Sequence, residues 1–129
     1  MNPDNINPEN YRNRPIECIE YTQWLGFCPG NAFKYIWRHD GKNGLEDLKK
    51  AEWYLLRQIG EEPHYAELDP DCWADRGMRL HDIAYTFSAV QHQALQHIWA
   101  FAAHDSYHDL HAALACVRSL MAQYGQEAV

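Results

Sequence analysis

The chain of 129 residues lacks the long apolar run that a membrane span requires, since no stretch approaches roughly 18 consecutive apolar residues. Its first fifteen residues, MNPDNINPENYRNRP, are polar and contain no apolar segment of the kind found in secretory signals. We therefore expect a cytoplasmic protein that does not bind to a membrane.

Cysteine pairs with the spacing of metal or redox sites are also missing. The four cysteines, Cys18, Cys28, Cys72 and Cys116, form no CxxC pair and fit no zinc framework. Because Cys18 and Cys116 lie within apolar helical patterns, we expect reduced thiols in the core.

Positive charge is scarce, with 11 Lys and Arg against 18 Asp and Glu, a net charge of -7. This balance argues against general nucleic-acid binding as the function. The charge is uneven: residues 12–59 carry eight basic and six acidic side chains, whereas residues 60–129 carry three and ten. A locally cationic segment beside an acidic one favours a small anionic ligand. The alternative is a chance asymmetry on a solvated surface.

Alternating strand patterns are absent, and apolar residues recur at helical spacing instead. The sequence predicts an all-α protein: one domain over residues 1–129, with about five helices in a small bundle. The expected helices cover about 15–25, 31–40, 45–59, 79–103 and 107–124. Residues 60–77, which include two prolines and six acidic residues, are expected to form an acidic loop. Residues 78–125 would then form a long helical hairpin.

The apolar stripe of the fourth expected helix, 79–103, is broad, because Trp99 and Phe101 lie beside Ile98. Such a stripe indicates burial on two sides, which predicts a homo-oligomer. Packing on the first three helices of the same chain is the alternative.

Five of the eleven basic residues lie between Gly26 and Leu55. Helical spacing places Asn31, Lys34 and Arg38 on one face, opposite the apolar residues. Phosphates are bound by cations and by the unpaired N–H groups of helix N-termini. The expected helix starts at Gly30-Asn31 and Gly44-Leu45 would come together if the chain folds back. This pattern predicts a phosphate site built from Asn31, Lys34, Tyr35, Arg38, Lys42 and Lys50.

Three aromatic side chains in this segment, Tyr35, Trp37 and Trp53, are candidates for stacking on a nucleobase. The alternative is a solvated basic face above core aromatics. No GxxxxGK[ST] phosphate-binding loop is present, because the spacing from Gly26 to Lys34 is different. On helix 45–59, Glu46 and Lys50 form a favourable i, i+4 pair.

Residues 11–59 contain a spaced pattern made of these residues: Ile16-Glu17-Cys18-Ile19, Gly30-Asn31, Lys34-Tyr35, Arg38, Lys42, Asp47-Leu48, Lys50-Ala51 and Tyr54-Leu55. In this pattern the segment resembles a family of small phage-encoded proteins of unassigned function, which includes a nucleotide kinase of tailed phages that lacks a P-loop. Where the family often has His-Tyr before the first helix, this chain has Asn10-Tyr11. Residues 60–129 resemble nothing that we recognise.

The resemblance implies nucleotide binding in the cytoplasm of an infected host cell, and transfer of a phosphoryl group to a deoxynucleoside monophosphate. Phosphoryl transfer requires cations around the transferred group and usually Mg²⁺ held by carboxylates. The hypothesis is that Lys34, Arg38, Lys42 and Lys50 contact phosphates, with Asp47 and Lys50 catalytic and Asp47 or Asp40 helping to hold Mg²⁺. A structural pairing of Asp47 with Lys50 at i, i+3 is the alternative for that carboxylate.

A second function is compatible with the same sequence. A non-catalytic phage protein that binds and inhibits a host or defence protein would use its acidic second half against a basic surface.

Six of the eight histidines fall after residue 80, and His104, His108 and His111 follow at spacings of four and three. Such spacing places imidazoles on one helix face, as metal ligands require. Three His-Asp dipeptides, at 39–40, 81–82 and 104–105, resemble metal phosphohydrolases of the His-Asp type. Exposed histidines or a subunit contact are the alternative, and we assign no metal ligands.

Overall fold

A computed structural model describes residues 14–41, 43–61 and 69–127. Within these ranges the protein consists of helices and contains no strand, which confirms the all-α prediction. The elements are α2 (Ile19–Thr22), α3 (Phe27–Arg38), α4 (Gly44–Glu61), α5 (Pro70–Asp82), the 3₁₀ helix η2 (Ala84–Thr86), α6 (Ala89–His104) and α7 (Tyr107–Glu127). None of the described helices is both long enough and apolar enough to cross a membrane.

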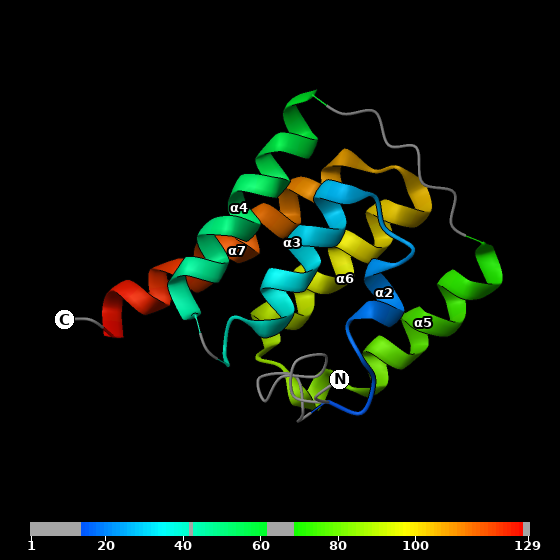
Figure 1. The fold of residues 1–129 in the computed structure, drawn as a ribbon, viewed down its shortest axis with the longest axis horizontal. Coiled ribbons are helices and arrows are strands. Elements are labelled where there is room, and N and C mark those ends of the chain that lie inside the picture. The colour runs from blue at the N-terminus through cyan, green and yellow to red at the C-terminus, as the bar shows by residue number, and fades with distance from the viewer. Residues whose placement is uncertain (1–13, 42, 62–68, 128–129) are drawn as a thin grey trace, which may run out of the picture.

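Helices α3 and α4 pack against each other as an antiparallel pair joined by a short polar turn, as expected (Figure 1). Gly44 begins α4 with a φ of 37°, a left-handed conformation that glycine adopts most readily. A Cβ at this position would also lie 3.0 Å from the Tyr124 ring of α7. Glycine therefore allows both the sharp entry into α4 and the close approach of α7.

The second antiparallel pair is α6 and α7, connected at Asp105, whose φ of 54° is left-handed (Figure 1). Helix α7 also packs on α4, and α6 also packs on α3 and α5. Most apolar side chains of α6 are therefore buried, including Leu95, Ile98 and Phe101. Its broad apolar stripe is buried within one chain, so it gives no support of its own to the predicted homo-oligomer.

The prediction of a loop over residues 60–77 is wrong for most of its length. Helix α4 continues to Glu61, and α5 begins at Pro70. The side chain of Asp69 accepts hydrogen bonds from the backbone N–H groups of Asp71 and Cys72, at 2.8 and 3.1 Å. Proline is well suited to a first helical turn, so these residues start a helix. The helical turn expected at 64–68 lies outside the described residues.

The single helix expected over 79–103 is also wrong, and so is the hairpin expected over 78–125. The chain leaves α5 after Asp82, forms η2 and begins α6 at Ala89. The Ser88 side chain accepts a hydrogen bond from the Gln91 N–H, while the Gln91 side chain accepts one from the Ser88 N–H, each at 3.2 Å. This capping box starts a new helix. The true hairpin is formed by α6 and α7.

The first two expected helices have different bounds. In place of a helix over 15–25, the structure has the four residues of α2, where Ile19 is 57% exposed and Tyr21 is buried. Helix α3 begins at Phe27, four residues before the predicted start at Asn31. Asn31 therefore lies in the second turn, where its amide donates to the Phe27 carbonyl at 2.8 Å.

An aromatic cluster occupies the centre of the core, where the Tyr21 ring contacts Phe33, Trp37 and Trp99 at 5.2–5.7 Å between centroids. Arg14 covers one side of this cluster, with its guanidinium 4.1 Å from the Phe87 ring centroid and 5.6 Å from that of Trp37. The core holds α3 in place, and with it the side chains on its outer face.

Candidate cationic-aromatic surface

Three cationic side chains converge on one ring, that of Tyr35. The Lys34 Nζ lies 4.4 Å from the ring centroid, the Arg38 Cζ 4.9 Å and the Lys50 Nζ 5.4 Å. These distances are within the range of cation–π attraction, which offsets part of the repulsion among like charges. We call the set Lys34, Tyr35, Arg38, Lys50 and Tyr54 the cationic-aromatic surface.

The helical pattern explains how this surface forms. The inward face of α3 consists of Ala32, Phe33, Ile36 and Trp37, all fully buried. Lys34, Tyr35 and Arg38 occupy the intervening positions and are partly exposed. The antiparallel packing of α4 then brings Lys50 and Tyr54 alongside them. The structure thus unites four predicted site residues from two helices.

Arg38 is held by a buried carboxylate. Its Nε and Nη2 atoms donate to the two oxygens of Asp47, both at 3.2 Å. The Asp47 side chain is fully buried and that of Arg38 is 23% exposed. Asp47 also lies in the first turn of α4, where the helix dipole favours negative charge. Asp47 therefore fixes Arg38 across the hairpin.

Lys50 pairs with a different carboxylate. Its Nζ lies 3.7 Å from the Glu46 carboxylate, which confirms the predicted i, i+4 pair. The alternative in which Asp47 pairs with Lys50 is wrong, because packing across the hairpin brings Asp47 to Arg38. Both members of the Glu46–Lys50 pair are well exposed, so the pair contributes little to stability.

Lys34 interacts with a neutral group. Its Nζ donates to the Asn31 Oδ1 at 3.2 Å, which confirms that these two residues share one face of α3. Both residues also line a shallow hollow of about 250 Å³ at the α2–α3 connection, with Gly26 and Phe27 on its rim. No carboxylate of the described residues forms an ion pair with Lys34, so its charge is uncompensated there.

Aromatic side chains extend the surface along the hairpin. The Tyr35 and Tyr54 rings stack with centroids 6.1 Å apart and planes at 13°. Tyr54 also contacts Phe27 and Trp53, which are 75% and 58% exposed. Large exposed aromatics next to cations are available to a ligand.

Sequence reasoning named Tyr35 and Trp53 correctly as accessible rings but was wrong about Trp37, which is fully buried. It missed Tyr54, which belongs to the surface, and Phe27, which contacts Tyr54. The available signal was that Tyr54 follows Lys50 by one helical turn and so shares its face.

The expected meeting of two helix N-termini is wrong. Helix α3 is twelve residues long, or about 18 Å at 1.5 Å per residue. Because α4 runs antiparallel to it, the N-terminus of α4 lies beside the end of α3, where Asp47 contacts Arg38. The N-terminus of α3 instead lies beside the middle of α4, where Phe27 contacts Tyr54. The two helix starts therefore belong to opposite ends of the hairpin (Figure 1).

Burial dominates the electrostatics of the neighbouring Cys18. It raises the pKa of this thiol to about 12, even though Arg14, Lys34 and Arg38 act in the opposite direction. The prediction that Cys18 is a buried thiol is confirmed, whereas Cys28, Cys72 and Cys116 are partly exposed. None of the four cysteines forms a disulfide.

The other predicted residues lie as follows. Asp40 accepts hydrogen bonds from Arg14 at 3.0 and 3.3 Å, and Lys42 falls outside the described residues. His97 pairs with Asp109 at 2.9 Å, and the His104 ring packs on Trp73. Over the ranges that the structure describes, no three His, Cys, Asp or Glu side chains gather as a metal site would require.

Comparison with known proteins gives a family match for the N-terminal part of the chain. Residues 6–56 match the sequence model of a protein family of unknown function, DUF3310. No curated protein and no solved structure matches the chain. The expected resemblance over residues 11–59 is thus confirmed to the extent that this segment, which contains all of the cationic-aromatic surface, is similar to a family of unknown function.

Proposed function

We propose that the protein binds a nucleotide, with its phosphates at the cationic-aromatic surface. The observation that carries this proposal is the convergence of Lys34, Arg38 and Lys50 on the Tyr35 ring. Three cations held together repel one another, and their two carboxylate partners, Asp47 and Glu46, leave one positive charge in excess. An anion at this place relieves that repulsion.

Lys34 and Lys50 are the side chains that a phosphate would engage most directly. The ammonium of Lys34 donates to an amide and has no ion pair to lose. Lys50 would exchange a long, exposed contact with Glu46 for a charge-assisted hydrogen bond to phosphate. Arg38 contributes a fixed charge, because Asp47 already binds two of its donor atoms.

The exposed rings account for the base. Stacking of a base on an aromatic side chain contributes roughly 1–3 kcal/mol and depends little on which base it is. Phe27 and Trp53, both in contact with Tyr54, offer such rings beside the cations. A phosphate on Lys34 and a base on Phe27 would use one continuous surface along the first turns of α3.

A deoxynucleoside monophosphate kinase is the specific activity within this proposal that the resemblance favours. In that reaction Lys34, Arg38 and Lys50 would neutralise charge on the transferred phosphoryl group. Asp47 would act as a positioning residue for Arg38. The carboxylates proposed to hold Mg²⁺ do not fit that role as they stand, since Asp47 binds Arg38 and Asp40 binds Arg14. We therefore derive no step through a metal ion.

A thermal-shift panel of nucleoside mono-, di- and triphosphates, with and without Mg²⁺, tests the proposal. A ligand at 100 times its dissociation constant is expected to stabilise the fold by about 2.7 kcal/mol. Lys34→Ala should weaken binding at least tenfold, on the order of 1.4 kcal/mol, through loss of a phosphate contact. Lys49→Ala is the matched control, because Lys49 is exposed on α4 and lies outside the surface.

A nucleotide that stabilises the wild type and Lys49→Ala but not Lys34→Ala would support the proposal, and transfer of a phosphoryl group to that nucleotide would then be assayed. A flat panel on folded protein would contradict it. The acidic half of the chain, with three basic and ten acidic residues over 60–129, would then favour binding to a basic host or defence protein, tested with such a protein as the partner.

A further inference from the structure

A hollow between α5 and α6 lies away from the cationic-aromatic surface. Helix α5 packs on α6, whereas α4 lies on the opposite side of the bundle (Figure 1). The hollow has a volume of about 480 Å³, within the range of about 300–1,000 Å³ that is common for small-molecule sites. The function proposed above makes no use of it.

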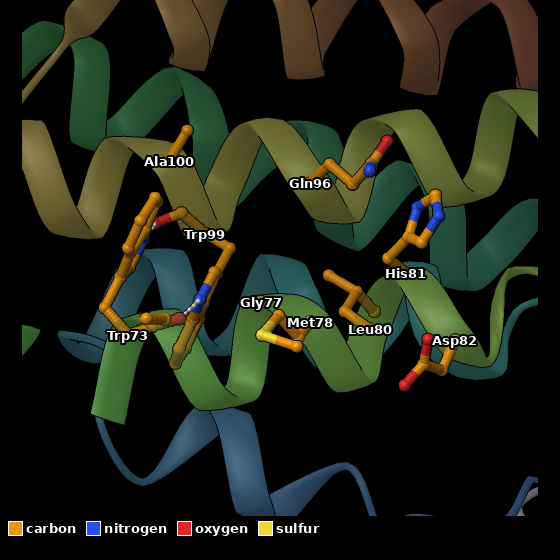
Figure 2. A pocket seen from close by; sticks show the side chains of 10 residues that line it. Trp73, Gly77, Met78, Leu80, His81, Asp82, Gln96, Trp99 and Ala100 are labelled. Atoms are coloured by element: carbon orange, nitrogen blue, oxygen red, sulfur yellow. Dashed lines mark hydrogen bonds between the residues drawn. The ribbon is translucent and has the colours of Figure 1, made fainter. Parts of the chain in front are cut away.

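Two sets of hydrogen bonds, which we call clamps, fix the spacing between α5 and α6. At one end, the indole Nε1 of Trp73 donates to the Trp99 carbonyl and the Nε1 of Trp99 donates to the Trp73 carbonyl, both at 3.0 Å (Figure 2). At the other end, the His92 Nε2 donates to the Leu80 carbonyl at 2.9 Å. Because both ends are bound, the helices cannot close on the space between them without breaking these contacts.

Small residues leave the space between the clamps unfilled. Gly77 and Ala74 on α5 and Ala100 on α6 line the hollow, and Met78 beside them is 69% exposed. A Cβ at Gly77 would lie 3.6 Å from the Trp99 Nε1, which is an ordinary contact. Packing therefore does not require glycine here, and a larger side chain would enter the hollow.

The polar side chains of the hollow gather at the end distant from the tryptophans. Figure 2 shows His81, Asp82 and Gln96 around that end. Within the described part of the chain these three side chains have no hydrogen-bond or ion-pair partner. The tryptophan N–H groups, in contrast, are already satisfied, so the partly exposed Trp73 ring presents apolar surface, while Trp99 is buried behind it.

The charge at the polar end is negative. Asp82 is the last residue of α5, at the negative end of the helix dipole. A carboxylate and a helix C-terminus together favour a cation. We propose that this hollow binds a small amphipathic cation, with a flat apolar body against Trp73 and Met78 and a protonated amine at Asp82.

Three indoles that differ in charge test this proposal: tryptamine, which is cationic, 3-methylindole, which is neutral, and indole-3-acetate, which is anionic. The chain has five tryptophans, so the indole N–H signals of Trp73 and Trp99 in a two-dimensional NMR spectrum report directly on the hollow. Tryptamine should shift these signals saturably, with a dissociation constant of about 1 mM or lower and at least tenfold below that of 3-methylindole. Indole-3-acetate should bind more weakly than either.

Two substitutions separate shape from charge. Gly77→Leu should abolish binding of all three probes by filling the hollow. If Gly77→Leu fails to fold, Ala74→Leu, at an exposed position of α5, should fill the hollow and abolish binding in its place. Asp82→Asn should bring tryptamine to within about twofold of 3-methylindole, a difference of roughly 0.4 kcal/mol. Asp71→Asn, which removes the same charge from the first turn of α5, is the control and should change nothing.

Several outcomes would overturn the proposal. These are the absence of any saturable shift, equal binding of tryptamine and indole-3-acetate, and binding that survives both Gly77→Leu and Ala74→Leu. A dimer that forms without probe binding and dissociates in Gly77→Leu would show that a second copy occupies the hollow instead.

Discussion

At the scale of single residues, the cationic-aromatic surface combines one fixed cation with two adaptable ones. Arg38 is locked by two hydrogen bonds to a fully buried carboxylate, whereas the polar partners of Lys34 and Lys50 are an amide and an exposed glutamate. Arginine suits the fixed position, since its planar fork matches both oxygens of a carboxylate. A ligand phosphate would therefore find one preset charge and reposition the two lysines around itself.

Replacing Asp47 with Asn should destabilise the fold, because Arg38 would lose its charged partner in a largely buried position. We expect the free energy of unfolding to fall by about 2 kcal/mol, less than for a fully buried pair because Arg38 keeps some solvent contact. Urea denaturation measures this change. Lys50→Gln, which removes the exposed pair with Glu46 and the 5.4 Å approach to the Tyr35 ring, is the control and should cost no more than about 0.5 kcal/mol. Equal losses of unfolding free energy in the two variants would contradict the distinction between the buried Asp47–Arg38 pair and the exposed Glu46–Lys50 pair.

At the scale of elements, helix starts decide the architecture more than helix interiors do. The capping box at Ser88 begins α6, and the Gln91 of that box also donates to the Ile36 carbonyl at 2.9 Å. The last turn of α3 and the first turn of α6 are thereby joined. The same glutamine that caps α6 thus helps to hold the helix that carries Lys34 and Arg38.

Ser88→Ala should reduce the free energy of unfolding by about 1 kcal/mol, because the Gln91 N–H loses its acceptor. Ser88→Asp should retain most of the stability, since aspartate is an equally good N-cap. Thermal or urea denaturation of the three proteins gives the comparison. If aspartate proved no better than alanine, the stabilisation at this position would not come from capping.

The helix periods of the sequence predicted α4 and α7 well, and the two faces of α3 though not its start, because each of these helices has one polar and one buried face. They failed at residues 83–88, where Ile83 and Phe87 remain buried across the break, so apolar spacing continued through it. They failed again at Asp69-Pro70, where proline and acidic residues indicated a loop although they also start helices.

For the site, local spacing predicted that Lys34 and Arg38 share a face, but it left the partner of Asp47 open. Lys50 at i, i+3 and Arg38 nine residues earlier were both within reach of that carboxylate. The choice depends on the register of α3 against α4, which the packing of side chains between the helices determines. The hollow between α5 and α6 was invisible to sequence reasoning for a related reason, since α5 itself was missed.

At the scale of the whole molecule, α6 packs against α3, α5 and α7, and α7 extends back to the end of α3 (Figure 1). The Tyr124 hydroxyl lies 2.9 Å from the His39 Nδ1 and donates to the His39 carbonyl at 3.3 Å. Residues 85 apart in sequence are therefore tied together next to the hairpin turn that leads into α4.

His39 should make stability depend on pH. Burial lowers the pKa of its imidazole below the ordinary value of 6.5, with Arg14 acting in the same direction and Asp40 and Asp47 opposing it. The unfolded chain therefore binds a proton near pH 6.5 while the folded chain does not. This contribution to stability is complete above pH 6.5 and is lost as the pH falls toward the lowered pKa, by at most about 1.4 kcal/mol per pH unit.

Urea denaturation of the wild type and of His39→Asn between pH 8 and pH 5 isolates this contribution, because the other titrating groups are common to both proteins. The difference in stability between them can change by at most about 1.4 kcal/mol per proton and pH unit. The stability advantage of the wild type should be largest at the alkaline end and shrink below pH 6.5, because only the wild type carries the suppressed imidazole. His111→Asn, at an exposed position of α7, is the matched control for the loss of a histidine. An advantage of His39 that stays constant with pH would mean that the imidazole contributes by packing and its bond to Tyr124, and that its protonation is not coupled to folding.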